Sequence, residues 1–303
     1  MITVTGELGS GKSTIAKLIA KKEKIKYYST GEILRKIADK MNMSILEINK
    51  YAENNKSIDG DIDAFTIDLG KSLESFIMDS RMAWHFIPDS FKVLLTVDSK
   101  VAAQRIIMQT NRMSESYIDI EAAEKNLLER KNSELKRFID LYGVNYTDKN
   151  NFDLILDTTI ADQFRLSEFI IEKYTEWKTN KHHAGFWISP KRLIPSQKIT
   201  MLCNNEYDLI NNSISRYGFK DKYPISVVKH NGMYYIFDGH KRTSAAIHNA
   251  IDFVRIIIIS NEDDNVELIS GLKSIEFINT STNMTWIYDW EDAHFFNFSN
   301  YPK

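Results

Sequence analysis

The strongest constraint on the fold of this chain lies in its first fourteen residues. An apolar, β-branched run over residues 2–5 is typical of a buried strand, Gly6 opens a loop, and apolar residues at helical spacing begin at Ile15. The loop has the G-x-x-x-x-G-K-S pattern, which is typical of phosphate-binding loops when it joins a strand to a helix. We therefore predict that residues 6–14 bind a nucleotide.

The residue types of this loop suit a triphosphate. Glycines allow consecutive backbone N–H groups to turn towards an anion, and the N-terminus of the following helix adds partial positive charge. Lys12 can reach the β- and γ-phosphates of ATP, and the Ser13 hydroxyl is placed to bind Mg²⁺. The predicted ATP-binding residues of the loop are Gly6, Gly9, Ser10, Gly11, Lys12, Ser13 and Thr14.

Length and composition narrow the class of protein. A chain of 303 residues is long enough for two domains. It holds no apolar run long enough to cross a membrane, and it starts directly in the predicted strand, so we expect neither a membrane span nor a signal peptide. The single cysteine, Cys203, cannot form an internal disulfide, and we expect a cytoplasmic protein. The net charge of −2, balanced in both halves, argues against nucleic-acid binding without excluding a local basic patch.

Strand-like and helix-like segments alternate through residues 1–178. Strands are expected at residues 2–5, 24–28, 76–78, 91–97 and 151–159, and helices include 44–53, 64–74, 119–141 and a last one ending near Trp177. Ser44, with Glu47 three residues on, predicts a capping box. This alternation predicts an α/β domain with a parallel sheet and helices on both faces.

Several stretches of this first domain resemble the nucleoside monophosphate kinases, and most closely the short cytidylate kinases of archaeal type. The matching stretches occur in the family's order and spacing at residues 28–38, 51–53, 79–83, 130–137, 142–144 and 153–158. The resemblance implies a P-loop NTPase fold. It also implies transfer of the γ-phosphoryl group of Mg-ATP to a small acceptor, a pyrimidine nucleoside monophosphate such as CMP or dCMP.

The resemblance assigns further roles. Arg35 and Arg81 would hold the phosphate of the acceptor, and Asp79 would lie with them at the acceptor site. Three acidic residues just before the helix at 64–74 would lie near the base of the acceptor: Asp59, Asp61 and Asp63. Arginines would close over the donor and the transferring group: Arg105, Arg130 and Arg137. Arginine suits this task because its planar fork binds phosphate bidentately and stays charged. The catalytic residues would be Lys12, Arg81, Arg130 and Arg137.

Two positions depart from the family's usual pattern. Ser80 stands where glycine usually precedes the arginine, and Lys131 stands where an acidic residue usually follows Arg130. Both changes touch the acceptor and the lid rather than the donor site. An alcohol acceptor, such as free serine or a modified base in DNA, therefore stays open as an alternative.

A second, smaller α+β domain is expected at residues 186–303, after a polar linker at 179–185. Helices are expected at residues 207–216, 243–250 and 263–280, a hairpin at 224–237 with its turn at 229–232, and a strand at 253–259. The pair His182-His183 lacks a third ligand at metal-binding spacing, which favours a solvated loop. The aromatic tail at 286–298 should pack against the domain, with a homodimer or inter-domain contact as the alternative.

The turn after the hairpin has the composition of a second anion site. A glycine, a helix N-terminus and two cations come together there, in Asp238, Gly239, His240, Lys241, Arg242 and Thr243. Residues 193–259 resemble the ParB/sulfiredoxin-like superfamily, which includes chromosome-partitioning proteins that bind CTP and free-serine kinases that use ADP. Residues 239–246 fit its phosphate-binding G-x-x-R-x-x-A-A pattern and lean towards the serine-kinase branch.

The resemblance implies that the second domain binds a nucleotide or a phosphate. The expected catalytic glutamate of the serine-kinase branch corresponds to Ser196-Gln197, and glutamine cannot act as a general base. We therefore expect binding rather than catalysis here. A nucleotide-responsive, ParB-like DNA-binding or switch protein stays open as an alternative for the whole chain.

Overall fold

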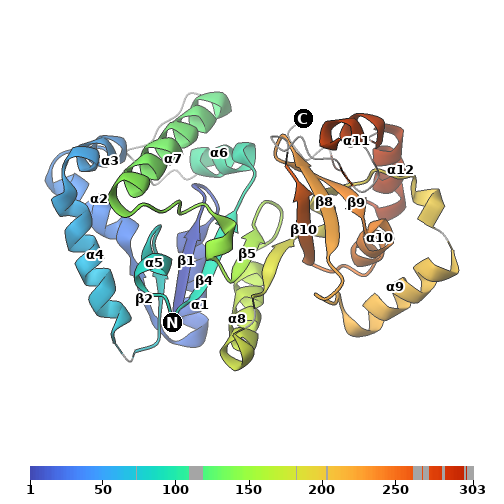
Figure 1. Ribbon diagram of the computed structural model, residues 1–303, viewed down its shortest axis with the longest axis horizontal. Helices are drawn as coiled ribbons and strands as arrows, with labels where there is room; N and C mark the ends of the chain where they lie inside the picture. The colour runs from blue at the N-terminus through green and yellow to red at the C-terminus, as the bar shows by residue number, and fades with distance from the viewer. Residues whose placement is uncertain are drawn as a thin grey trace. The chain divides into compact units, whose positions relative to one another are not determined.

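The computed structural model describes residues 1–72, 74–108, 119–181, 183–202, 204–261, 268, 273–281, 284–296 and 298. The chain divides into two compact units, Met1–Ala184 and Gly185–Lys303 (Figure 1). The last helix of the first unit continues to Asn180, so the first residues of the expected linker are helical. Within the described ranges, no helix is both long enough and apolar enough to cross a membrane.

The first unit contains a parallel sheet, as the alternation of segments predicted. Its strands are β1 (Ile2–Gly6), β2 (Lys26–Ser29), β3 (Phe76–Asp79), β4 (Phe91–Thr96) and β5 (Leu154–Asp157), in the order β2-β3-β1-β4-β5. Every neighbouring pair in this sheet is parallel. All residues of β1, β3 and β5 are buried, which is typical of strands covered on both faces.

Eight α-helices accompany this sheet in the described part of the unit. They are α1 (Lys12–Glu23), α2 (Thr30–Lys40), α3 (Ile45–Asn54), α4 (Lys56–Gly70), α5 (Ala83–Phe86), α6 (Ser99–Met108), α7 (Ile120–Tyr142) and α8 (Gln163–Asn180). In Figure 1, α3 and α7 lie beyond the end of β1 that leads into α1, and the N-terminus lies at the opposite end. The carboxyl ends of the strands, where ligands bind in open α/β sheets, therefore face α3 and α7.

Side chains and a glycine close in sequence to the helix ends cap α3 and α7. The Ser44 Oγ accepts from the Glu47 N–H at 3.2 Å, and the Glu47 carboxylate accepts from the Ser44 N–H at 2.7 Å, which confirms the predicted capping box. Asp119 caps α7 by accepting from the Ala122 N–H at 2.7 Å. Gly143, with φ of 69°, ends the same helix in the left-handed conformation that glycine adopts without strain.

The prediction that an acidic cluster precedes a helix at 64–74 is wrong, because the helix begins earlier. Helix α4 begins at Lys56, so Asp59, Asp61 and Asp63 lie inside it. The reason is tertiary: Ile58 and Ile62 on this helix pack with the buried Ile48 of α3. Burial of these side chains outweighs the weak helix propensity of the Asp-Gly-Asp sequence.

The second unit contains a mixed sheet, which makes it an α+β domain. Its strands are β6 (Gly185–Ile188), β7 (Leu193–Ile194), β8 (Ile225–His230), β9 (Met233–Asp238) and β10 (Val254–Ser260), in the order β6-β10-β8-β9-β7. Strands β8 and β9 form the predicted antiparallel hairpin. Its turn contains Asn231 and Gly232 with φ of 48° and 75°, as a type I′ turn requires.

The described helices of this unit are α9 (Asn205–Tyr217), α10 (His240–His248), α11 (Ser274–Ser281) and α12 (Met284–His294). Helix α10 starts three residues earlier than predicted, so Gly239 is its N-cap. In the tail, Trp290 is fully buried and its indole N–H donates to the Gln197 carbonyl at 3.0 Å, so this part packs against its own unit. Residues 263–267 and 269–272 of the predicted helix 263–280, together with His182 and Cys203, lie outside the described residues.

Candidate active site

The phosphate-binding loop joins β1 to α1 with its glycines in conformations that other residues avoid. Gly9 and Gly11 have φ of 76° and 79°. A Cβ on Gly9 would lie 2.7 Å from the Ala102 Cα on α6, so no larger residue fits. The Ser10 hydroxyl is buried and has no hydrogen-bond partner in the described structure. The loop therefore keeps open the backbone cradle and the hydroxyl that a phosphate group would use.

Lys12 and Ser13 extend this loop into the first turn of α1. The Lys12 ammonium donates to the Glu7 carbonyl at 3.4 Å, and burial together with the Arg81 charge lowers the pKa of Lys12 to about 7. The Ser13 hydroxyl donates to the Asp79 carboxylate at 2.5 Å. An anionic polyphosphate beside Lys12 would restore its ordinary high pKa, because an opposite charge favours the ammonium form.

Ser13 and Asp79 also fit a magnesium ion. Both offer hard oxygen atoms, and Mg²⁺ in nucleotide sites usually takes one or two protein oxygens and completes its shell with phosphates and water. The described residues include no group of three or more His, Cys, Asp or Glu side chains able to hold a metal by themselves. The donor set therefore suits a metal that arrives with the nucleotide.

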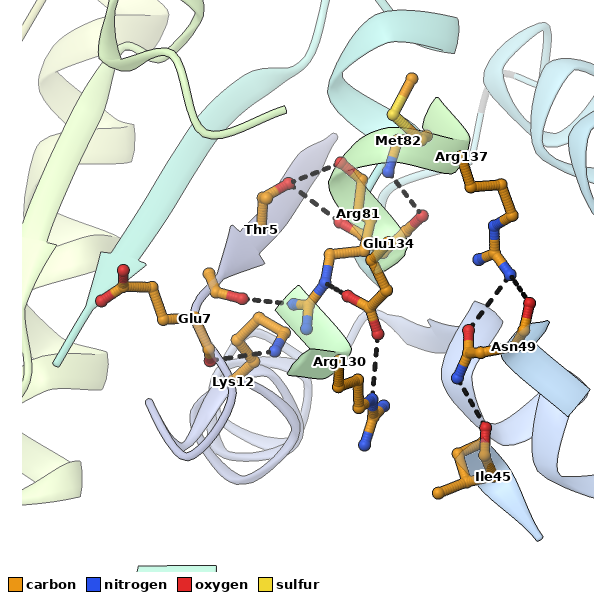
Figure 2. Close-up of polar contacts among 12 residues, drawn as sticks. Thr5, Glu7, Lys12, Ile45, Asn49, Arg81, Met82, Arg130, Glu134 and Arg137 are labelled. Carbon is orange, nitrogen blue, oxygen red and sulfur yellow. Dashed lines mark hydrogen bonds and ion pairs between the residues drawn. The ribbon is translucent and has the colours of Figure 1, made fainter. Parts of the chain in front are cut away.

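A buried glutamate joins two of the predicted catalytic arginines (Figure 2). Glu134 on α7 accepts from the Arg81 Nε at 2.7 Å and from the Arg130 Nε at 3.0 Å. Arg81 also donates to the Gly6 carbonyl at the end of β1. Burial alone would raise the pKa of Glu134, but the two arginines outweigh burial and bring it to about 2. Glu134 was not among the predicted site residues, although it stands four residues after Arg130 and so one helical turn away.

Arg137 lies beside Asn49, apart from the two arginines held by Glu134 (Figure 2). Its Nη1 donates to the Asn49 Oδ1 at 3.1 Å, and its Nε lies 3.6 Å from the Asp59 Oδ2. That Nε and that carboxylate oxygen are both buried, and neither has a hydrogen-bond partner among the described residues. The pair therefore offers one donor and one acceptor that a ligand could engage.

Asp63 lies one helical turn after Asp59 on α4. Its carboxylate accepts from the Tyr142 hydroxyl at 2.5 Å. Burial, with the Asp59 charge adding to it, raises the pKa of Asp63 to about 6. Asp59 and Asp63 both line the cavity, whereas Asp61 is exposed and does not, because a position two residues away faces the opposite side of a helix.

Most of the predicted site residues line one cavity. Those that do are Gly9, Gly11, Lys12, Ser13, Thr14, Arg35, Asp59, Asp63, Asp79, Arg81, Arg130 and Arg137. Arg105 does not: its guanidinium donates to the Thr158, Thr159 and Gly9 carbonyls at 2.7, 3.1 and 3.3 Å. It therefore ties the phosphate loop to the end of β5.

Lys131 contacts the phosphate loop from α7. Its ammonium lies 3.0 Å from the Glu7 Oε1, while the other carboxylate oxygen of Glu7 accepts from the Val97 N–H at 3.0 Å. The Glu7 carbonyl is also the acceptor for Lys12. The departure from the family pattern at position 131 thus supplies an ion pair between α7 and the loop.

The second unit holds a separate cavity of about 650 Å³ beside the start of α10. Three cations line it, and two of them are already paired, Lys241 with Glu206 and Arg242 with Asp238; the third is Lys220. His240 is 5% exposed, and burial lowers its pKa to about 4. Its Nε2 therefore accepts the Ser196 N–H at 3.1 Å as a neutral ring. An anion that binds beside Lys241 and Arg242 would compete with these two carboxylates.

Comparison with known proteins concerns the first unit. The profile of the cytidylate kinase-like family matches residues 1–160. The cytidylate kinase of Sulfurisphaera tokodaii is 33% identical over 184 residues, which cover 60% of this chain and 98% of that protein. The cytidylate kinase of Methanocaldococcus jannaschii is 35% identical over 167 residues, covering 54% and 90%. A solved shikimate kinase from Bacteroides thetaiotaomicron aligns at 12% identity with a TM-score of 0.41, covering 58% and 97%. The chain therefore belongs to the cytidylate kinase-like family, and its first unit is a nucleotide-dependent P-loop kinase domain.

Proposed function

We propose that the first unit transfers the γ-phosphoryl group of Mg-ATP to a pyrimidine nucleoside monophosphate, CMP or dCMP. One observation carries the proposal. A single cavity is lined at once by the phosphate loop, by Arg35 and Arg81, and by Asp59 and Asp63. The phosphate loop would bind the donor triphosphate, the two arginines would bind the phosphate of the acceptor, and the two aspartates would contact its base.

In this reaction an oxygen of the acceptor phosphate attacks the γ-phosphorus, and the bond to the bridging β-oxygen breaks as ADP leaves. The transition state needs little covalent help and much fixed positive charge. Lys12, Arg81 and Arg130 supply that charge, and Glu134 fixes the two arginines in place. Mg²⁺ held by Ser13 and Asp79 would neutralise charge on the donor phosphates.

The polar groups that Asp59, Asp63 and Arg137 bring to the cavity support cytosine over uracil. Cytosine carries an exocyclic amino donor, and uracil has a carbonyl oxygen at the same place. The Asp59 Oδ2 without a hydrogen-bond partner and the Asp63 carboxylate both accept hydrogen bonds, so they favour the amino group. Arg137 beside them can donate to a ring carbonyl.

A coupled assay of ADP production tests the proposal. The acceptors are CMP, dCMP, UMP, AMP, free serine and free threonine. We expect selective turnover of CMP or dCMP, and we expect Asp59→Asn to reduce the preference for CMP over UMP. The exposed Asp61→Asn is the matched control on the same helix. Turnover of an amino acid alone would move the function to an alcohol acceptor, and turnover of no acceptor by a chain that binds ATP would contradict the proposal.

For the second unit we propose a regulatory site for a phosphate-bearing metabolite at residues 238–243. The predicted resemblance to the ParB/sulfiredoxin-like superfamily motivates it. It is supported by the cavity beside α10 and by Gly239, which lines that cavity and has a φ of 108° that favours glycine. Titration with CTP, ATP and inorganic phosphate should show binding that Arg242→Ala weakens. Gel retardation of DNA at two salt concentrations tests the DNA-binding alternative, which predicts a steep loss with salt.

A further inference from the structure

Ser80 directly follows β3, between Asp79 and Arg81, and lines the cavity of the first unit. The residue is 6% exposed. The Ser80 Oγ accepts two backbone hydrogen bonds, from the Met82 N–H and from the Ala83 N–H, each at 3.2 Å (Figure 2 shows the Met82 contact). It therefore holds the first turn of α5 in place.

These two contacts determine what the hydroxyl can still do. A serine hydroxyl has two acceptor positions and one donor hydrogen, so two incoming N–H groups leave only the donor. That hydrogen has no acceptor among the residues that the structure describes. The backbone of Ser80 is satisfied, because its N–H donates to the Val4 carbonyl at 3.1 Å and its carbonyl accepts from the Thr5 hydroxyl at 2.9 Å. The hydroxyl hydrogen is thus a buried donor at the edge of a ligand cavity.

Arg35 lies at the same edge of the sheet. Its guanidinium lies against Gly31, where a Cβ would be 3.6 Å from the Arg35 Nη1, and the Ser29 Oγ lies 3.7 Å from the same Cβ position. Ser29 faces Asp79 in the register of β2 and β3, one residue before Ser80. Arg35 has no carboxylate partner within the described chain, so an unpaired cation and an unpaired hydroxyl donor line the same cavity.

We infer that Ser80 is a further acceptor-binding residue, whose hydroxyl donates a hydrogen bond to an anionic oxygen of the acceptor beside Arg35. The inference rests on the proposed function, because it takes the acceptor to carry a phosphate group. It deepens that function by assigning a second group to the acceptor phosphate. A buried donor left unpaired is unfavourable, so the site should favour an acceptor that supplies this charged oxygen.

The test measures acceptor binding with the phosphate loop already filled. Wild-type protein and the variants Ser80→Ala and Ser80→Thr are saturated with Mg²⁺ and a non-hydrolysable ATP analogue, and CMP is titrated in by calorimetry. Thr keeps the hydroxyl that Ala removes. We expect the dissociation constant for CMP to rise about tenfold or more in Ser80→Ala, as for loss of a hydrogen bond to a charged group. We expect little change in Ser80→Thr, and the same affinity for the ATP analogue in all three proteins.

The outcomes separate the inference from the proposed function. Equal CMP affinity in wild type and Ser80→Ala, even with a lower melting temperature in the variant, would reduce Ser80 to a cap of α5 and overturn the inference. If wild type does not bind CMP, the proposed acceptor is wrong, and inorganic phosphate becomes the probe in the same filled state. Weaker phosphate binding in Ser80→Ala then supports the inference, and no difference, or no phosphate binding in wild type, overturns it.

Discussion

Replacing Glu134 with glutamine should strongly destabilise the first unit. The side chain keeps its shape but loses the charge that Arg81 and Arg130 share. Those arginines lower the pKa of Glu134 from 4.5 to about 2. At about 1.4 kcal/mol per pH unit, this lowering corresponds to about 3 kcal/mol. Removing one partner of a buried ion pair costs about 3–5 kcal/mol in general, so the two magnitudes agree.

The pH dependence of stability provides a second signature of Glu134. A carboxylate whose folded-state pKa is depressed stabilises the fold above its unfolded-state pKa. The contribution of Glu134 should therefore be complete above pH 4.5 and should disappear as the pH falls towards about 2. Glu134→Gln should lack this part of the acid transition.

Urea unfolding from pH 2 to pH 7 measures both effects, and amide hydrogen exchange along α7 assigns them to the first unit. Glu129→Gln is the matched control, because Glu129 is exposed on the same helix and should change stability by less than about 0.5 kcal/mol. A loss below about 1 kcal/mol in Glu134→Gln, with an unchanged acid transition, would refute the assignment of Glu134 as the counter-ion of both arginines.

Three other features of the first unit lead to measurable outcomes. The pKa of Lys12 is about 7 in the protein without ATP, so binding of ATP above pH 7 should be accompanied by uptake of a proton. Calorimetry in buffers of different ionisation enthalpy measures this uptake, and Lys12→Met should abolish it. The pKa of Asp63 is raised from 3.8 to about 6, so this group should add stability as the pH falls from about 6 towards 3.8, and Asp63→Asn should flatten that stretch of the urea-unfolding profile. Gly9→Ala should weaken ATP binding, and it should destabilise the fold more than Gly143→Ala does. Both positions have positive φ, but of the two only the Cβ at Gly9 would meet a neighbour, the Ala102 Cα at 2.7 Å. Equal losses of stability in the two variants would contradict this.

Much of the structure of the first unit could be predicted from short stretches of contiguous residues. The phosphate-binding loop, the capping box at Ser44 and the alternation of strands and helices each depend on residues within a few positions of one another. Short-range signals of this kind act through backbone conformation and local hydrogen bonds, so a sequence displays them directly. Most of the first-unit site residues that the phosphate-loop pattern and the family resemblance named also line the cavity.

The partner of each charged side chain was decided only by the tertiary structure. Glu134 is hydrogen-bonded to Arg81, which is 53 residues away in sequence, and Arg137 is hydrogen-bonded to Asn49, which is 88 residues away. Packing of Ile58 and Ile62 extended α4 over the acidic cluster and turned Asp61 away from the cavity. The sequence shows which side chains are charged but not which of them pair. Pairing depends on distance and burial, and both arise only when elements that are remote in sequence pack together.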